Sequence, residues 1–403
     1  MNSNELFKSL FNDYDNYREK KLNSDFISHA QLKELIAGMQ TNNLFRIEKI
    51  GESLERKEIF SAVLGEGETK ILAWSQMHGD EPTATSALFD LFNFFSSSDK
   101  YDDLREILLK KITFHFIPML NPDGAEMFTR ENAYSVDLNR DALRLQSDES
   151  KIIWDYAEKL EPEFGFNLHD QNSYYTAGKS NNASAISLLS SPMNYVKSIN
   201  YTREKSMQVI CRIKEALSLF IPQNIARYKD DFEPRAFGDN FTRNGISIIL
   251  IESGFYKNDV KKDFVRKLNF VALLSAFKSI AEKDYESIEH KKYFDIPENE
   301  ELLFDLLLRN LTLNYNGRNF KIDIGIKREK KLNKELQSFY YKSKIADLGD
   351  LSIFYGIEEH DLTGYQVIPD NKLNVDEPAD LKILFNGQLK KEVRNGFIIE
   401  KVK

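Results

Sequence analysis

The sequence predicts an α/β protein with a mixed, largely parallel central sheet and helices on both faces, followed by a small β-rich C-terminal domain. Two patterns predict this fold class. Up to about residue 285, short apolar runs typical of buried strands alternate with helical patterns. Beyond about residue 300, apolar and polar residues alternate with period two, which is typical of half-buried antiparallel strands.

These patterns divide the 403 residues into two domains and a linker. Residues 1–285 form the large domain, and its first part (1–45) is expected to be helical because apolar residues recur there at helical spacing. A charged stretch with Pro297 marks a linker over residues 286–300. Residues 301–403 form the small domain, whose role the sequence leaves open.

The expected strands and helices of the large domain alternate along the chain. Short apolar runs predict strands at residues 59–64, 70–74, 112–119, 164–168 and 247–251. A helix is expected from Pro82, because proline is tolerated in the first turn and an apolar stripe at helical spacing follows it. Residues 201–220 form a second long helical pattern. This alternation favours a largely parallel sheet covered by helices.

The small domain carries the signals of antiparallel hairpins. Asn-Gly pairs begin at residues 316, 386 and 395, and this dipeptide favours the two-residue turns of hairpins. The Leu-rich stretch at residues 301–308 is the exception, and we expect one helix there. No residue pattern in this domain resembles a catalytic motif.

Composition argues against several kinds of partner. Lys+Arg 55 against Asp+Glu 63 gives a net charge of −8, which disfavours general binding to nucleic acid or to an anionic membrane. Cys211 is the only cysteine, so a cysteine-ligated metal site and an internal disulfide are excluded. The first twenty residues contain no apolar core of a signal peptide, and we expect a cytoplasmic protein that could form oligomers.

Two histidines and a glutamate follow predicted strands. His78 and Glu81 come shortly after the apolar run that ends at Trp74, and Gly79 allows a tight bend between them. His169 follows another apolar run. In open α/β sheets ligands bind at the carboxyl ends of strands, and catalytic zinc is commonly held by two histidines and one carboxylate. We therefore expect one Zn²⁺ per chain on His78, Glu81 and His169.

Further polar clusters come directly after core strands. The turn 121–124 (Asn-Pro-Asp-Gly) follows the strand at 112–119, and a stretch with paired Arg and Asn residues follows that turn. A carboxylate also ends the aliphatic run at 248–251. The residues concerned are Arg130, Asp137, Asn139, Arg140 and Glu252.

Taken in order, these motifs resemble the zinc carboxypeptidase family, the M14 metallopeptidases. The resemblance covers roughly residues 45–285, and several separated motifs occur in the family's order. The resemblance implies the zinc carboxypeptidase fold and the activity of a metallocarboxypeptidase, which is a hydrolase. Within the family, it implies a member of the cytoplasmic bacterial type with a C-terminal extension. It also implies that His78, Glu81 and His169 are the zinc ligands.

The resemblance assigns a role to each remaining residue. Asp137 corresponds to the carboxylate that orients the first ligand histidine. Arg130 corresponds to the arginine that polarises the scissile carbonyl and stabilises the oxyanion. Asn139 and Arg140 correspond to the pair that holds the C-terminal carboxylate of the substrate. Glu252 corresponds to the general base that takes a proton from the metal-bound water.

Two further assignments are weaker. Tyr228 is the nearest candidate for the family's mobile active-site tyrosine, and Tyr256 is the other candidate. Asp239 lies where the pocket for the terminal side chain is expected, and it could favour a basic residue or equally be a turn or cap residue. The sequence also departs from the digestive enzymes of the family, because Asp170 stands after His169 where those enzymes have serine.

The expected function is that of a zinc-dependent exopeptidase that hydrolyses the C-terminal peptide bond of peptides. Its partner would be a peptide or small amide substrate with a free carboxylate. Two alternatives stay open: a metal-dependent deacylase or amidase acting on N-acyl amino acids or modified metabolites, and a binding module that has lost its chemistry. The small domain would serve packing or dimerisation, or else limit access to the cleft.

Overall fold

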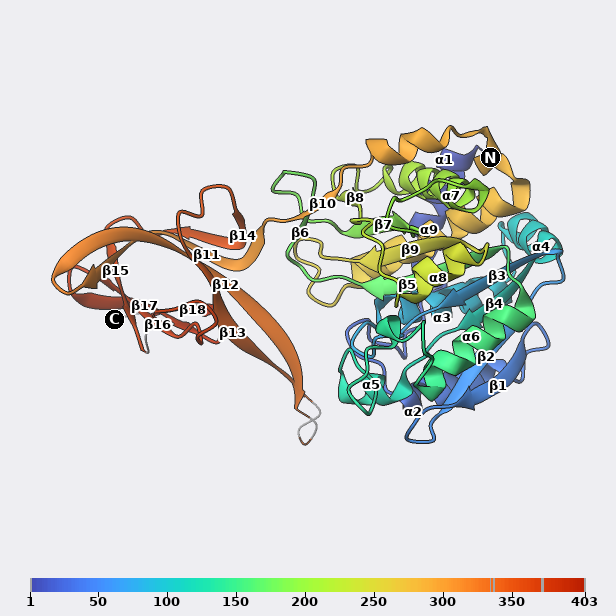
Figure 1. Ribbon diagram of the computed structural model, residues 1–403, viewed down its shortest axis with the longest axis horizontal. Helices are drawn as coiled ribbons and strands as arrows, with labels where there is room; N and C mark the ends of the chain where they lie inside the picture. Colours follow the sequence, from blue (N-terminus) through green and yellow to red (C-terminus); the bar gives the residue numbers. More distant parts are fainter. Residues whose placement is uncertain (1, 334, 336–337, 371–372, 402–403) are drawn as a thin grey trace. The chain divides into compact units, whose positions relative to one another are not determined.

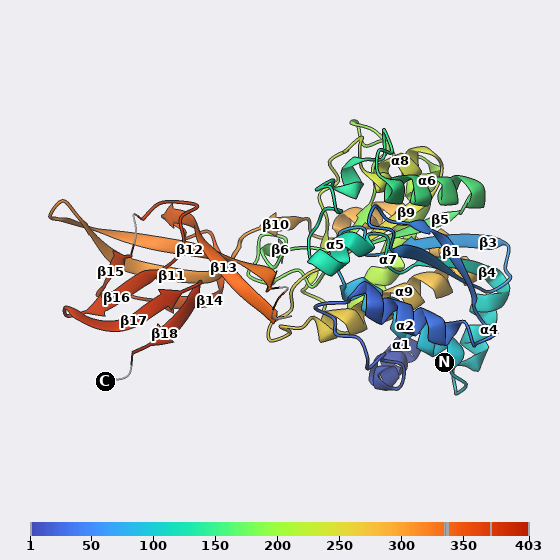
Figure 2. The ribbon, with the colours of Figure 1, turned by 90° about the horizontal axis from the view of Figure 1, so that it is seen from below.

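The chain forms two compact units in the computed structural model, which describes residues 2–333, 335, 338–370 and 373–401 (Figures 1 and 2). The α/β unit comprises residues 1–172 and 184–299, and the β-rich unit comprises residues 173–183 and 300–403. Residues 1, 402 and 403, at the ends of the predicted domains, lie outside the described residues. The β-rich unit thus includes an internal segment, residues 173–183, that no sequence pattern separates from the large domain.

An eight-stranded mixed sheet forms the centre of the α/β unit. Its strands lie in the order β1-β2-β4-β3-β5-β9-β7-β8. Neighbours β3/β4, β3/β5, β5/β9 and β7/β8 are parallel, and the other pairs are antiparallel. The predicted mixed, largely parallel sheet is therefore confirmed. The strands are β1 Arg46–Glu52, β2 Glu58–Leu64, β3 Thr69–Trp74, β4 Ile112–Ile117, β5 Phe164–Asp170, β7 Ile186–Ser190, β8 Ile225–Arg227 and β9 Ser247–Ser253.

Helices cover both faces of this sheet, as the buried side chains of β3 show. Ile71 and Ala73 point into one core, with α3, α7 and α9, whereas Leu72 and Trp74 point into the other, with α6 and α8. Both faces of the strand are buried, so its sequence is continuously apolar rather than alternating. The helices are α1 Ser3–Asp13, α2 His29–Met39, α3 Thr83–Ser96, α4 Asp102–Lys111, α5 Pro122–Met127, α6 Asp148–Leu160, α7 Tyr201–Leu217, α8 Phe237–Arg243 and α9 Asp263–Glu282.

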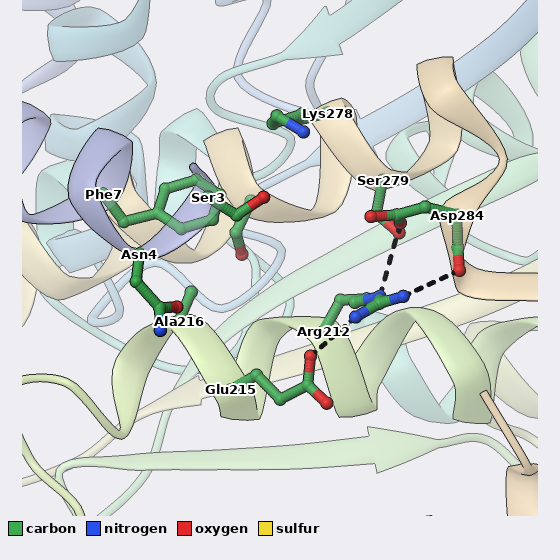
Figure 3. A pocket seen from close by; sticks show the side chains of 10 residues that line it. Ser3, Asn4, Phe7, Arg212, Glu215, Ala216, Lys278, Ser279 and Asp284 are labelled. Carbon is green, nitrogen blue, oxygen red and sulfur yellow. Dashed lines mark hydrogen bonds and ion pairs between the residues drawn. The ribbon is translucent and has the colours of Figure 1, made fainter. Parts of the chain in front are cut away.

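Polar contacts of Arg212 connect α7 to the end of the α/β unit. Figure 3 shows α1 beside α7 and α9, where Arg212 of α7 contacts Glu215 and the residues that follow α9. Residues 284–287, at the start of the stretch predicted as a linker (286–300), and residues 290–295 within it form short 3-10 helices. Tyr293 is fully buried in the core. None of the described helices is long and apolar enough to cross a membrane.

The β-rich unit is built around a second eight-stranded sheet. The helix expected at residues 301–308 is wrong, because residues 299–301 form β10 (Asn299–Glu301) and residues 303–315 form β11 (Leu303–Tyr315). Strand β11 pairs with β12 and β14. Its residues Leu306, Leu308 and Leu311 lie in the hydrophobic core of this unit. The further strands are β6 Tyr175–Ala177, β12 Arg318–Asn333, β13 Ser338–Gly349, β14 Tyr355–Asp361, β15 Tyr365–Pro369, β16 Leu381–Phe385, β17 Gln388–Arg394 and β18 Phe397–Glu400.

Candidate metal centre

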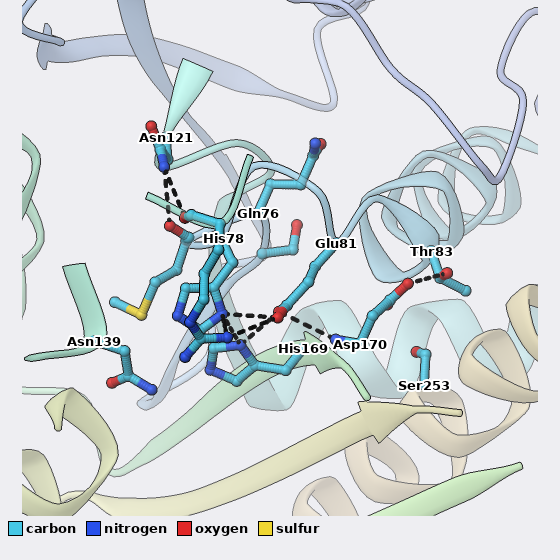
Figure 4. A network of polar contacts seen from close by, with 12 residues as sticks. Gln76, His78, Glu81, Thr83, Asn121, Asn139, His169, Asp170 and Ser253 are labelled. Atoms are coloured by element: carbon cyan, nitrogen blue, oxygen red, sulfur yellow. Dashed lines mark hydrogen bonds and ion pairs between the residues drawn. The ribbon is translucent and has the colours of Figure 1, made fainter. Parts of the chain in front are cut away.

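The loop between β3 and α3 carries two of the predicted ligands. A side chain at Gly79 would place its Cβ 1.9 Å from the carbonyl carbon of Gly124, so only glycine allows this close approach to the turn after β4. Pro82 then ends the loop, and α3 begins at Thr83. The sequence from His78 to Pro82 therefore folds as predicted, with a tight bend that turns both His78 and Glu81 towards the end of β5 (Figure 4).

His78, Glu81 and His169 converge on one point and are all buried (Figure 4). The Nδ1 atoms of the two histidines lie 3.1 Å apart, and each lies 2.8 Å from a carboxylate oxygen of Glu81. A tetrahedral Zn²⁺ with bonds of about 2.0–2.1 Å separates its ligand atoms by about 3.3 Å, close to this spacing. Imidazole lone pairs and a carboxylate that face one another repel unless a proton or a cation lies between them. The donor set therefore fits a zinc ion.

Asp137 fixes the orientation of His78. Its Oδ1 lies 3.1 Å from His78 Nε2, and since a carboxylate only accepts, Nε2 donates and Nδ1 keeps its lone pair for a metal. Burial alone would lower the pKa of His78, but the carboxylates of Glu81 and Asp137 outweigh it and raise this pKa to about 9. Burial alone would raise the pKa of Glu81, but His78 and His169 hold it well below its usual range. The metal-free site therefore keeps a proton that a metal must displace.

The register of the sheet brings Glu252 to the same place. In the parallel pair of β5 and β9, His169 lies directly opposite Glu252. Loss of hydration in this packed environment raises the pKa of Glu252 to about 8, and the charge of Glu81 contributes to the same shift. A carboxyl group with a raised pKa beside a metal site is the expected state of a proton acceptor.

Arg130 points into the site from the loop after α5. Its Nε donates to Asp137 Oδ2 at 3.0 Å, and its Nη1 lies 3.1 Å from His78 Nδ1 and 3.4 Å from Glu81 Oε1. The side chain keeps 39% of its surface exposed, so the guanidinium borders both the ligand cluster and the solvent. It can therefore meet a polar group of a bound molecule beside the metal.

Asn139 and Arg140 lie in a short 3-10 turn at Leu138–Arg140. Asn139 Oδ1 accepts from the N–H of Phe237 at 3.0 Å, which ties this turn to the start of α8. Arg140 Nη1 donates to the carbonyl of Asn139, and its Nε lies 3.4 Å from Glu233 Oε2. The arginine that was predicted to hold a carboxylate thus has a carboxylate of the protein beside it.

Asp239 was predicted as a site residue, whereas no sequence pattern marked Glu233. The two side chains lie in different environments. Asp239 is 5% exposed, and its Oδ2 accepts from the N–H of Glu233 at 2.7 Å. Burial raises its pKa to about 7. Glu233 is more exposed and also pairs with Arg235 through both carboxylate oxygens. No local pattern marked Glu233, because its place beside Arg140 depends on the packing of two distant segments.

The two tyrosine candidates follow different strands of the sheet. Tyr228 directly follows β8, and its N–H donates to the carbonyl of Leu188 at 2.9 Å. Tyr256 follows β9, and its ring packs on Phe264 with centroids 4.5 Å apart. The role of Tyr228 stays a prediction.

Residues 32–209 match the model of the zinc carboxypeptidase family (Peptidase_M14). This stretch contains all three predicted metal ligands together with Arg130, Asp137, Asn139 and Arg140, whereas Glu252 lies beyond it.

Curated relatives match over a shorter length of the chain. Carboxypeptidase SOL1 of Arabidopsis thaliana is 33% identical over 103 residues, which cover 23% of this chain and 21% of the relative. Carboxypeptidase 2 of Trichophyton rubrum is 29% identical over 121 residues, which cover 30% of this chain and 21% of the relative. The matched part thus spans about a fifth of the length of these relatives.

Solved structures match in fold. A metallo-carboxypeptidase from Burkholderia cenocepacia superposes with a TM-score of 0.54 at 18% identity, over 64% of this chain and 70% of that chain. Carboxypeptidase A from Helicoverpa armigera gives a TM-score of 0.51 at 14% identity, over 70% of this chain and 80% of that chain.

Proposed function

Since the chain contains a domain of the zinc carboxypeptidase family, we propose that it is a zinc-dependent exopeptidase that hydrolyses the C-terminal peptide bond of peptides. The observation that carries this proposal is the convergence of His78, Glu81 and His169, with Glu252 opposite His169 in the sheet. The substrate would be a peptide or small amide with a free carboxylate, and each chain would hold one Zn²⁺.

The ligand cluster sets the chemistry of this reaction. Bound zinc supplies a Lewis acid that lowers the pKa of a water molecule and polarises a carbonyl group. Two neutral imidazoles and one carboxylate leave the ion a net charge of about +1, which favours this activation. Asp137 accepts a hydrogen bond from His78 Nε2, which would leave the Nδ1 lone pair of His78 available to hold the ion.

Glu252 would act as the general base. Its carboxylate would accept a proton from the attacking water and pass it to the nitrogen of the leaving amino acid, so that the amine leaves as a neutral group. Burial and the nearby charge of Glu81 raise the pKa of Glu252, so its carboxylate would hold a proton more strongly than a solvated one. Arg130, exposed beside the ligands, would stabilise the negative charge that develops on the carbonyl oxygen, an interaction of about 3 kcal/mol for one donor of this kind.

Asn139 and Arg140 would restrict cleavage to the chain end. A guanidinium fork and an amide N–H group bind a carboxylate with defined geometry, so a free C-terminal carboxylate would set the register of the substrate. Glu233, 3.4 Å from Arg140, would compete with that carboxylate and would have to give way as the substrate binds.

Mass spectrometry of peptide products tests the proposal. The zinc-loaded protein should release one residue at a time from peptides with a free C-terminus and none from the same peptides with an amidated C-terminus. Glu252→Gln should retain zinc but lose this activity. Retained activity in Glu252→Gln would refute the role of the base. Cleavage of N-acyl amino acids without cleavage of peptides would instead favour the deacylase.

A further inference from the structure

We propose that Asp170 and Lys262 form a positioning brace that holds the metal ligands and Glu252 at a fixed separation. Neither side chain is among the proposed ligands or catalytic groups. The proposal extends the proposed function, because it explains what keeps the base aligned with the metal. It also makes a prediction about zinc binding that can be tested without any substrate.

Asp170 connects the two segments that carry metal ligands. It follows His169 directly, and its N–H donates to Glu81 Oε2 at 3.1 Å. Its side-chain Oδ2 accepts from the hydroxyl of Thr83, two residues after Glu81, at 2.6 Å (Figure 4). One residue thus contacts both the carboxylate ligand and the first turn of α3 that supports it.

Lys262 extends this connection to the strand of the base. Its Nζ donates to Asp170 Oδ2 at 3.0 Å and to the carbonyl of Ser253 at 3.0 Å. Ser253 directly follows Glu252, and its carbonyl also accepts from the N–H of Gln171. The ammonium group therefore bridges the end of β5, after His169, and the end of β9, after Glu252.

The brace is partly buried, and the backbone of Lys262 has a defined conformation. The Asp170 side chain is 8% exposed and that of Lys262 is 26% exposed, so this pair is less screened than a surface salt bridge. Lys262 has a φ of +57°, in the left-handed region that non-glycine residues rarely adopt. Such a conformation persists where the surroundings fix it, and it occurs preferentially at functional sites. It also accounts for the departure from the digestive enzymes at residue 170, since serine could not form an ion pair with a lysine.

Two single variants separate positioning from simple electrostatics. Lys262→Met removes a positive charge near the metal, which by charge alone would strengthen zinc binding. Asp170→Asn removes a negative charge, which by charge alone would weaken it. A positioning brace predicts the same direction for both, because either variant releases the same contact.

The expected result is a parallel loss in both variants. Zinc affinity, measured on the full chain by competition with a chelator, should fall about tenfold or more, the usual effect of losing a group that orients a ligand. For peptide substrates kcat should fall by a similar factor while KM stays within about twofold. The double variant should be no worse than the poorer single variant, because the two residues act as one unit.

Lys261→Met is the matched control, since Lys261 is the exposed neighbour in the chain. It should retain the zinc affinity and kcat of the unchanged protein. Lys262→Arg should recover part of the loss, and it provides the measurement if Lys262→Met does not fold. Zinc affinities of Lys262→Met and Asp170→Asn that change in opposite directions, or that equal those of Lys261→Met, would overturn the brace. The zinc measurement stands even if no peptide is cleaved, so failure of the proposed function and failure of the brace are distinguishable.

Discussion

The variant Asp137→Ala removes the group that orients the proposed ligand His78 but leaves His78 itself in place. Asp137 accepts from His78 Nε2 at 3.1 Å and from Arg130 Nε at 3.0 Å. Removing it frees the ring of His78 to rotate and to exchange tautomers. Losses of this kind reduce metal affinity by about 10–100-fold, which corresponds to about 1.4–2.7 kcal/mol. We therefore expect the zinc dissociation constant of Asp137→Ala to rise by that factor.

A control variant separates this effect from a local loss of stability. Asp137 also accepts from the N–H of Asn139 at 2.9 Å, and losing such a cap lowers the free energy of unfolding by about 1 kcal/mol. Asp141 accepts from the N–H groups of Gln146 and Ser147 in a similar way, away from the ligands. Asp141→Ala should therefore lower the melting temperature but leave the zinc affinity unchanged, as measured by chelator competition. Equal zinc affinities in the two variants would refute the reasoning.

Three further predictions concern proton release, substrate binding and stability. The pKa of His78 is raised to about 9 without metal, so binding of zinc at pH 7.5 should release about one proton. Zinc should also bind more tightly as the pH rises towards 9. Calorimetry in buffers of different ionisation enthalpy would measure the proton release. Glu233→Gln should lower KM for free-carboxylate peptides by up to about fivefold with kcat unchanged, because a partly exposed ion pair with Arg140 contributes about 0.2–1 kcal/mol. An unchanged KM would contradict competition between Glu233 and the substrate carboxylate for Arg140. Asp90→Ala should lower the free energy of unfolding by about 3–5 kcal/mol in urea titrations, because it leaves the fully buried guanidinium of Arg266 without its carboxylate.

The convergence of the three predicted metal ligands could be expected from sequence because their signal is local. His78, Glu81 and His169 each follow a continuous apolar run within a few residues, and the ends of parallel strands meet at one edge of a sheet. Glu233 and Lys262 carried no such signal. Their partners lie 93 and 92 residues away along the chain, so only the folded structure brings each pair together.

The difference between local and long-range signals also explains why the helix expected at residues 301–308 was wrong. Four of the six residues at 303–308 are leucine, a good helix former, and the stretch does not alternate with polar residues. In the structure these residues are the first part of β11, and partners in β12 and β14 cover its hydrogen-bonding edges. Helix propensity is a weak prior that such long-range pairing overrides. The transfer of residues 173–183 to the β-rich unit depends equally on distant contacts, such as that of the Tyr174 hydroxyl with the carbonyl of Arg328.

Hydrolysis of a free-carboxylate peptide in ¹⁸O-labelled water, followed by mass spectrometry at early times, tests the central claim most directly. If Glu252 and a metal held by His78, Glu81 and His169 direct water to the terminal peptide bond, the peptide shortens by one residue. The new C-terminus then carries one ¹⁸O atom, and the released amino acid carries none. Cleavage inside the peptide, or an unchanged peptide in the presence of bound zinc, would contradict the account.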